Sequence, residues 1–68
     1  MTKKEFLQTI EDFLKRTKMA PSAFGIKAYK DPRFVFDLRK GRECREKSQN
    51  RVLNFIQNYL TETEKEND

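Results

Sequence analysis

The chain has 68 residues, which allows one domain with a small hydrophobic core. It contains one cysteine and no histidine, so an intramolecular disulfide is excluded and a zinc site would rest on carboxylates and one thiol. We therefore expect no metal or other cofactor, no small-molecule substrate and no enzymatic activity. No apolar run approaches the roughly 20 residues of a membrane span, and we expect a cytoplasmic protein.

The formal net charge of +4 is unevenly distributed. Residues 61–68 contain four acidic residues and one basic residue, a charge of −3, which leaves +7 on residues 1–60. Between Lys27 and Arg51 lie nine basic and four acidic residues, a charge of +5. Such a local excess favours a polyanionic partner such as nucleic acid, although a solvated basic surface has the same composition.

A first helix is expected over residues 3–16. Thr2 and Glu5 have the spacing of a capping box, in which each side chain accepts a hydrogen bond from the other residue's backbone. Apolar residues then recur every three or four positions and form one face: Phe6, Leu7, Ile10, Phe13 and Leu14.

A second helix is expected from Pro21 to Ala28, because proline suits the first helical position. Gly25 inside it costs up to about 1 kcal/mol relative to alanine. A close helix–helix contact would explain this glycine; alternatively, Gly25 marks a helix end. Tyr29 and Lys30 are expected to form the turn that follows.

A third helix is expected over residues 32–40, with Asp31 as its cap, Pro32 at its first position and Gly41 at its end. At 100° per residue, the helix has an apolar side and a mixed side. The apolar side consists of Phe34, Val35 and Leu38, and the opposite side consists of Arg33, Phe36, Asp37 and Lys40.

Residues 42–47 form a basic connector, and a fourth helix is expected over residues 48–60 with Ser48 as its cap. Residues 1–60 would form the domain, and residues 61–68 a frayed acidic tail. Cys44 lies in the connector and is expected to be an exposed thiol. Its neighbours Arg45 and Lys47 would be able to lower the pKa of that thiol.

Two short helices separated by a tight turn and flanked by longer helices are typical of a helix-turn-helix. Arg33 would donate two hydrogen bonds to guanine, and Phe36 would pack on a thymine methyl group unless it belongs to the core or a dimer contact. Asp37 would accept from cytosine, orient Arg33 or Lys40, or form a surface ion pair. The expected phosphate-binding residues are Lys27, Lys30, Lys40, Arg42 and Arg45.

Residues 19–42 resemble the helix-turn-helix of the lambda-repressor/Cro-like family, including small alphaproteobacterial and phage-type regulators. Matching features are Phe24, a small residue at 25, the cap Asp31, the apolar pair Val35 and Leu38, and Gly41. The resemblance implies an all-α, lambda-repressor-like DNA-binding domain, which here is expected to have four helices where the family often has five. It also implies that Pro32, Arg33, Phe36 and Asp37 face DNA bases and that Arg42 contacts a phosphate. Tyr29 stands where the family has a glycine, and Pro21 where it often has glutamine.

The resulting hypothesis is a sequence-specific transcription regulator of double-stranded DNA. It would act as a homodimer, or as a heterodimer with a related regulator. The dimer would form through the fourth helix, with Leu53, Phe55, Tyr59 and Leu60 at the interface, unless these residues belong to the core of one protomer. The alternative hypothesis is a protein-interaction module, such as an antirepressor or a phage-type factor that binds a host regulator or polymerase.

Overall fold

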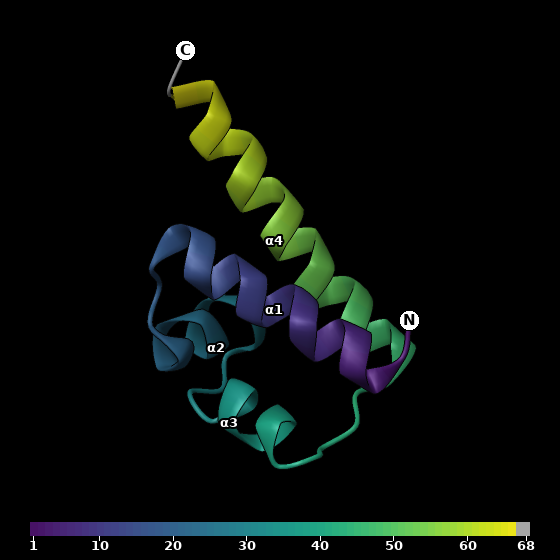
Figure 1. Ribbon diagram of the computed structural model, residues 1–68. Coiled ribbons are helices and arrows are strands. Elements are labelled where there is room, and N and C mark those ends of the chain that lie inside the picture. The colour runs from purple at the N-terminus through teal and green to yellow at the C-terminus, as the bar shows by residue number, and fades with distance from the viewer. Residues whose placement is uncertain (67–68) are drawn as a thin grey trace.

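Four helices follow one another in the computed structural model, which describes the backbone of residues 1–66 and the side chains of residues 1–62 (Figure 1). They are α1 (Lys3–Thr17), α2 (Pro21–Tyr29), α3 (Phe34–Arg39) and α4 (Glu46–Glu66). No strand occurs within residues 1–66, so the expectation of an all-α fold with four helices is confirmed. None of the helices in this part of the chain is long and apolar enough to cross a membrane.

The capping box predicted for α1 is present. The Glu5 N–H donates to Thr2 Oγ1, and the Thr2 N–H donates to Glu5 Oε1, both at 3.1 Å. The buried face of α1 consists of Phe6, Ile10, Phe13 and Leu14, as the apolar spacing predicted. Lys18 follows the last residue of α1 and caps the helix, and its φ of 59° lies in the left-handed region that glycine usually occupies.

Helix α2 begins at Pro21, as predicted, and includes Tyr29, which the sequence had placed in the turn. The chain leaves the helix at Lys30, which also has a left-handed backbone with a φ of 55°. The Lys30 N–H donates to the carbonyls of Gly25 and Ile26, and the Asp31 N–H donates to Gly25 at 3.0 Å. The turn therefore folds back over Gly25.

Helix α3 begins at Phe34 instead of residue 32. Asp31 still organises the approach, because its side chain accepts a hydrogen bond from the Arg33 N–H at 2.9 Å and its carbonyl accepts one from the Phe34 N–H at 3.1 Å. That second bond spans three residues, so Pro32 and Arg33 occupy a tight turn ahead of the helix. The expected start was wrong by two residues.

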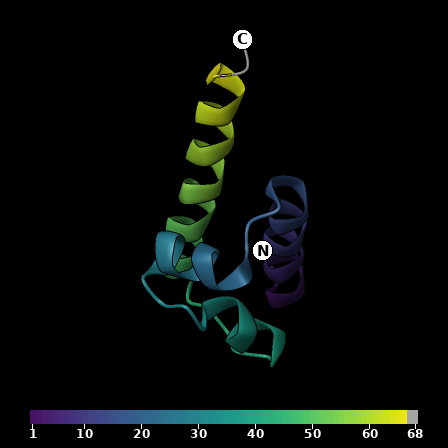
Figure 2. The same ribbon diagram turned by 90° about the vertical axis from the view of Figure 1, so that its left-hand side faces the viewer.

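Helix α4 is longer than expected at both ends. It begins at Glu46, so Ser48 lies inside it and is not its cap, and it continues past Leu60 to Glu66. A helix of this length extends about 31 Å, and the chain measures 38 × 21 × 19 Å. The end of α4 projects beyond the other helices (Figures 1 and 2). The expected frayed tail is helical up to Glu66, and residues 67 and 68 lie outside the described residues.

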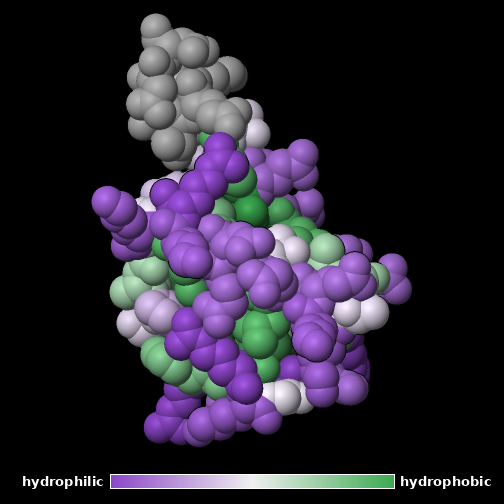
Figure 3. Space-filling model, in the orientation of Figure 1, coloured by the Kyte–Doolittle hydropathy of each residue, from purple (hydrophilic) through white to green (hydrophobic). Residues whose placement is uncertain are grey.

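All four helices contribute to one hydrophobic core. Its largest fully buried side chains are Phe6, Phe24 and Phe34, with Val52 from α4 beside them. The Phe6 and Phe34 rings meet edge to face with their centroids 6.5 Å apart, which joins α1 to α3. Hydrophilic residues cover most of the face in Figure 3, with apolar atoms visible between them. The core leaves one side of α3 uncovered.

Candidate nucleic-acid interface

The side of α3 that faces away from the core carries the residues that the sequence assigned to it. Arg33, Phe36 and Lys40 are exposed, and 42% of the Phe36 surface is accessible. Phe34, Val35 and Leu38 are buried on the opposite side. The predicted division of this helix into two sides is therefore confirmed, and Pro32 is exposed in the turn just before it.

Asp37 is engaged in an ion pair with Arg42. Arg42 Nη1 lies 3.3 Å from Asp37 Oδ2 and 3.5 Å from Asp31 Oδ2. The Arg42 guanidinium also lies over the rings of Phe34 and Tyr29, 5.7 and 5.9 Å from their centroids. Asp37 thus pairs with neither Arg33 nor Lys40. Arg42, expected to bind phosphate, holds the end of α3 against the turn.

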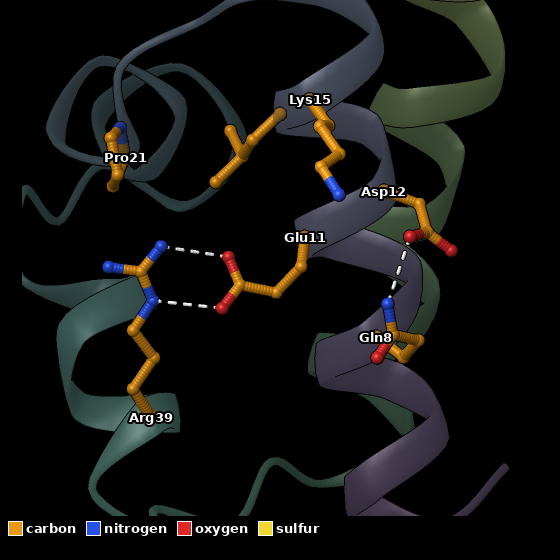
Figure 4. A pocket seen from close by; sticks show the side chains of 7 residues that line it. Gln8, Glu11, Asp12, Lys15, Pro21 and Arg39 are labelled. Atoms are coloured by element: carbon orange, nitrogen blue, oxygen red, sulfur yellow. Dashed lines mark hydrogen bonds and ion pairs between the residues drawn. The ribbon is translucent and has the colours of Figure 1, made fainter.

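A second ion pair joins α3 to α1. Arg39 Nε and Nη2 donate to the two carboxylate oxygens of Glu11 at 2.9 and 2.8 Å (Figure 4). These hydrogen bonds hold the pKa of the Glu11 carboxyl below its usual range, and they raise that of Arg39. The Arg39 guanidinium also lies 5.7 Å from the centroid of Phe36. No local sequence signal predicts this pair, because the two residues are 28 positions apart.

The remaining predicted phosphate-binding residues, Lys27, Lys30, Lys40 and Arg45, are all exposed. Among the described side chains, no carboxylate forms an ion pair with them or with Arg33. The carboxylates of Glu11, Asp31 and Asp37 are paired with Arg39 and Arg42. The surface around α3 therefore keeps an uncompensated positive charge.

The four residues expected at a dimer interface are all half-buried within a single chain, and they pack against its core. The ring centroids of Phe55 and Phe24 lie 5.6 Å apart, and those of Tyr59 and Phe13 lie 5.4 Å apart. Phe55 and Tyr59 are therefore core residues in part. Leu53 and Leu60 are likewise packed against the core and keep some exposed surface.

Cys44 differs from its predicted state. It is half-buried against the core, and that burial raises the pKa of its thiol despite the opposing effect of Arg42. It is therefore neither an exposed nor an activated thiol. Within residues whose side chains are described, no group of three histidine, cysteine or carboxylate residues is placed to hold a metal ion.

A groove of about 450 Å³ lies between α1 and α3, bounded by the Glu11–Arg39 pair (Figure 4). Gln8 and Asp12 on its wall are hydrogen-bonded to each other at 2.9 Å. Its polar groups thus largely satisfy one another.

Comparison of the chain with family models, curated proteins and solved structures finds no match.

Proposed function

We propose that the chain is a sequence-specific DNA-binding regulator in which α2, the turn and α3 form a helix-turn-helix of the lambda-repressor-like type. The observation that carries this proposal is the two-sided character of α3. One side is anchored by Phe34, Val35 and Leu38, while the other leaves Arg33 and Phe36 accessible. A helix held in this way offers base-contacting side chains to a major groove.

The charge around α3 supports a polyanionic partner. Asp31 and Asp37 are paired with Arg42, and Glu11 is paired with Arg39. Acidic groups near the proposed DNA surface are thus neutralised within the domain and would not repel a duplex. The exposed residues Lys27, Lys30 and Lys40 would contact phosphates and fix the position of the helix on the duplex.

Different roles follow for the side chains of the reading face. Arg33, just before the first turn of α3, would donate to guanine O6 and N7, and Phe36 would pack on a thymine methyl group. Pro32 would lie close to the backbone at the same end. Asp37 would act through Arg42, because that ion pair occupies its carboxylate. Arg42 would position α3 and would not be a primary phosphate contact.

Two copies of the domain would bind one operator. Their α3 helices would enter successive major grooves about 34 Å apart. The partner would be a second copy of this chain or a related regulator, joined through the projecting α4. The candidates for this contact are the half-buried residues Leu53, Phe55, Tyr59 and Leu60, which all keep exposed surface there.

The test begins with pull-down of genomic DNA to obtain the bound sequence. Arg33→Ala should then weaken binding to that sequence by about 1–3 kcal/mol, or roughly 5- to 150-fold in Kd, and relax the base preference at one position. Lys15→Ala, which removes one exposed charge from α1, is the matched control and should leave the base preference unchanged. Recovered DNA without an enriched sequence, or equal affinities for wild type and Arg33→Ala, would refute the proposal.

A second candidate function is favoured by the exposed Phe36 ring, which would suit a protein partner such as a host regulator or polymerase. Salt dependence separates the two candidates. Binding to DNA falls steeply with salt as counterions are released from phosphates, whereas a contact centred on Phe36 would change little.

A further inference from the structure

A second basic surface lies where the end of α2 meets the start of α4. There, a hollow of about 410 Å³ is lined by Tyr29, Arg45, Lys47, Ser48 and Arg51. This volume falls within the range of about 300–1,000 Å³ typical of small-ligand sites. Its lining has three cations, two hydroxyl groups and no carboxylate. Lys47 and Arg51 have no part in the reading face described above.

The side chains of this hollow are held by aromatic and hydroxyl contacts. The Tyr29 hydroxyl lies 3.0 Å from Ser48 Oγ, and the Arg51 guanidinium lies 5.6 Å from the centroid of the Tyr29 ring. The Tyr29 ring also stacks on that of Phe34, with centroids 4.6 Å apart, so Tyr29 is anchored to the core. The hollow is therefore built on a fixed aromatic residue.

The positive charge in the hollow is not compensated within the part of the chain whose side chains are described. No ion pair there involves Arg45, Lys47 or Arg51, and the nearby Glu46 is exposed outside the hollow. Lys47 and Arg51 are one helical turn apart, a spacing at which like charges destabilise a helix. This arrangement does not favour stability, and an anion bound between the two cations would offset their repulsion.

We infer that this hollow binds a phosphate group through Arg45, Lys47 and Arg51. Of the hydrogen-bonded hydroxyls of Tyr29 and Ser48, the one that accepts in that bond would donate its own proton to the phosphate. Guanidinium, ammonium and hydroxyl groups are the usual donors to phosphate oxygens. The start of α4 adds a helix dipole whose positive end favours an anion. The phosphate would belong to the backbone of a bound duplex or to a small phosphorylated molecule, and the chemistry is the same for both.

The hollow is linked to α3 through Arg42. An adjoining hollow of about 310 Å³ shares Tyr29, Arg45 and Ser48 with the first, and Arg42, Glu43 and Cys44 complete its lining. The Glu43 carboxylate lies 3.9 Å from Lys3 Nζ. Arg42 in turn pairs with Asp37 of α3. An anion that extended from the first hollow into the adjoining one would compete with Asp37 for the Arg42 guanidinium and would affect the proposed DNA surface. The duplex form of this inference rests on the proposed function, whereas the small-molecule form does not.

The test combines two titrations of the full chain. In the first, inorganic phosphate is added at constant ionic strength while amide resonances are followed by NMR. A phosphate site predicts saturable shifts at Lys47, Ser48 and Arg51 that are lost in Lys47→Gln/Arg51→Gln. The matched control Lys4→Gln/Lys15→Gln removes two exposed charges from α1 and should keep the shifts. Lys47→Gln alone serves if the double variant unfolds.

In the second titration, the affinity for a short duplex is measured against salt concentration. The slope of log K against log salt is negative. If the duplex supplies the phosphate, Lys47→Gln/Arg51→Gln should reduce the magnitude of this slope by roughly 2, and the control variant should reduce it by less. Saturable phosphate shifts with an unchanged slope would assign the site to a small phosphorylated molecule. The phosphate site would be overturned if no saturable shifts appear and the salt slope does not change. It would also be overturned if the control variant loses the shifts as fully as the double variant does.

The two proposals fail in different ways. A chain that binds no duplex but keeps the phosphate shifts would lose its proposed regulator function and keep this site. The opposite result is a chain that binds a specific duplex through Arg33 but shows no phosphate shifts, and whose salt slope is unaltered in Lys47→Gln/Arg51→Gln. That result would support the proposed function and overturn the phosphate site.

Discussion

Replacing Gly25 with alanine tests how the turn between α2 and α3 is built. A Cβ at this position would collide with the Asp31 carbonyl oxygen and lie 3.4 Å from the Cβ of Phe34. The obstructing group is backbone, which cannot move aside as a flexible side chain would. The same carbonyl accepts the hydrogen bond from the Phe34 N–H at 3.1 Å that precedes α3. Any shift that relieves the collision would therefore weaken this bond.

The expected magnitude follows from three opposing effects. Alanine in a helix interior is favoured over glycine by about 1 kcal/mol. Overpacking against fixed atoms costs about 2 kcal/mol, and loss of the Phe34 hydrogen bond costs about 1 kcal/mol more. We expect Gly25→Ala to lower the free energy of unfolding by about 2 kcal/mol, which corresponds to a fall in Tm of roughly 8–16 °C for a domain of this size.

The assay is urea and thermal unfolding followed by circular dichroism. Protein concentration is held fixed, because dimerisation would make stability concentration-dependent. Ser22→Ala, which adds alanine at an exposed position of the same helix, is the control and should change stability by less than about 0.5 kcal/mol. If Gly25→Ala proves as stable as the wild type, the turn does not close on Gly25, and the account of how α3 is placed is wrong.

Two further changes probe the turn and the Arg39 ion pair. Lys30→Gly should raise the free energy of unfolding by roughly 0.5–1 kcal/mol, because glycine adopts the left-handed backbone without the steric cost of a Cβ. A Tm no higher than that of Lys30→Ala would contradict this. The lowered pKa of Glu11 means that its contribution to stability is fully present above the ordinary glutamate range, near pH 4.3, and is lost as pH falls through the folded-state value. Glu11→Gln should therefore lower Tm at pH 7, and the difference from wild type should shrink at pH 3 or below. An equal difference at both pH values would show that the ion pair is not its cause.

Local sequence signals predicted those parts of the fold that depend on neighbours along the chain. The capping box at Thr2, the start of α2 at Pro21 and the apolar side of α3 were all predicted correctly. Gly25 lies inside α2 and does not mark a helix end, so the interpretation that it permits a close contact is the one that holds. The closest contact, however, is with the Asp31 backbone in the turn and not with a residue of another helix.

Helix ends were less predictable because the residues there are not the usual ones. Lysine and not glycine occupies the left-handed position after α1 and after α2, so no glycine marked those ends. Ser48 has the residue type of a cap, but it lies within α4, and its half-buried hydroxyl is 3.0 Å from that of Tyr29. The charged residues after Leu60 predict a frayed tail, yet glutamate and lysine are good helix formers, and α4 continues through them to Glu66.

The candidate site was predicted only where it depends on helical periodicity. The outward placement of Arg33, Phe36 and Lys40 followed from the 100° rotation per residue. The pairs that hold α3 in place join Arg39 to a residue 28 positions away and Arg42 to one 11 positions away. A single sequence does not show such long-range pairs. The one signal for the phosphate site in the sequence is the spacing of Lys47 and Arg51, which places two like charges one helical turn apart.

The basic residues near α3 fall into two groups: those that form ion pairs within the domain and those that face outward without such a pair. With six residues, α3 is too short to be stable alone, since isolated helices need roughly 12–15 residues. Arg39 and Arg42 fix it to α1 and to the turn through carboxylates. Arg33 and Lys40 have no such partner within the described side chains, and they face outward. Arg42→Ala and Arg33→Ala would thus weaken DNA binding for different physical reasons, the first by loosening α3 and the second by removing a contact with a base.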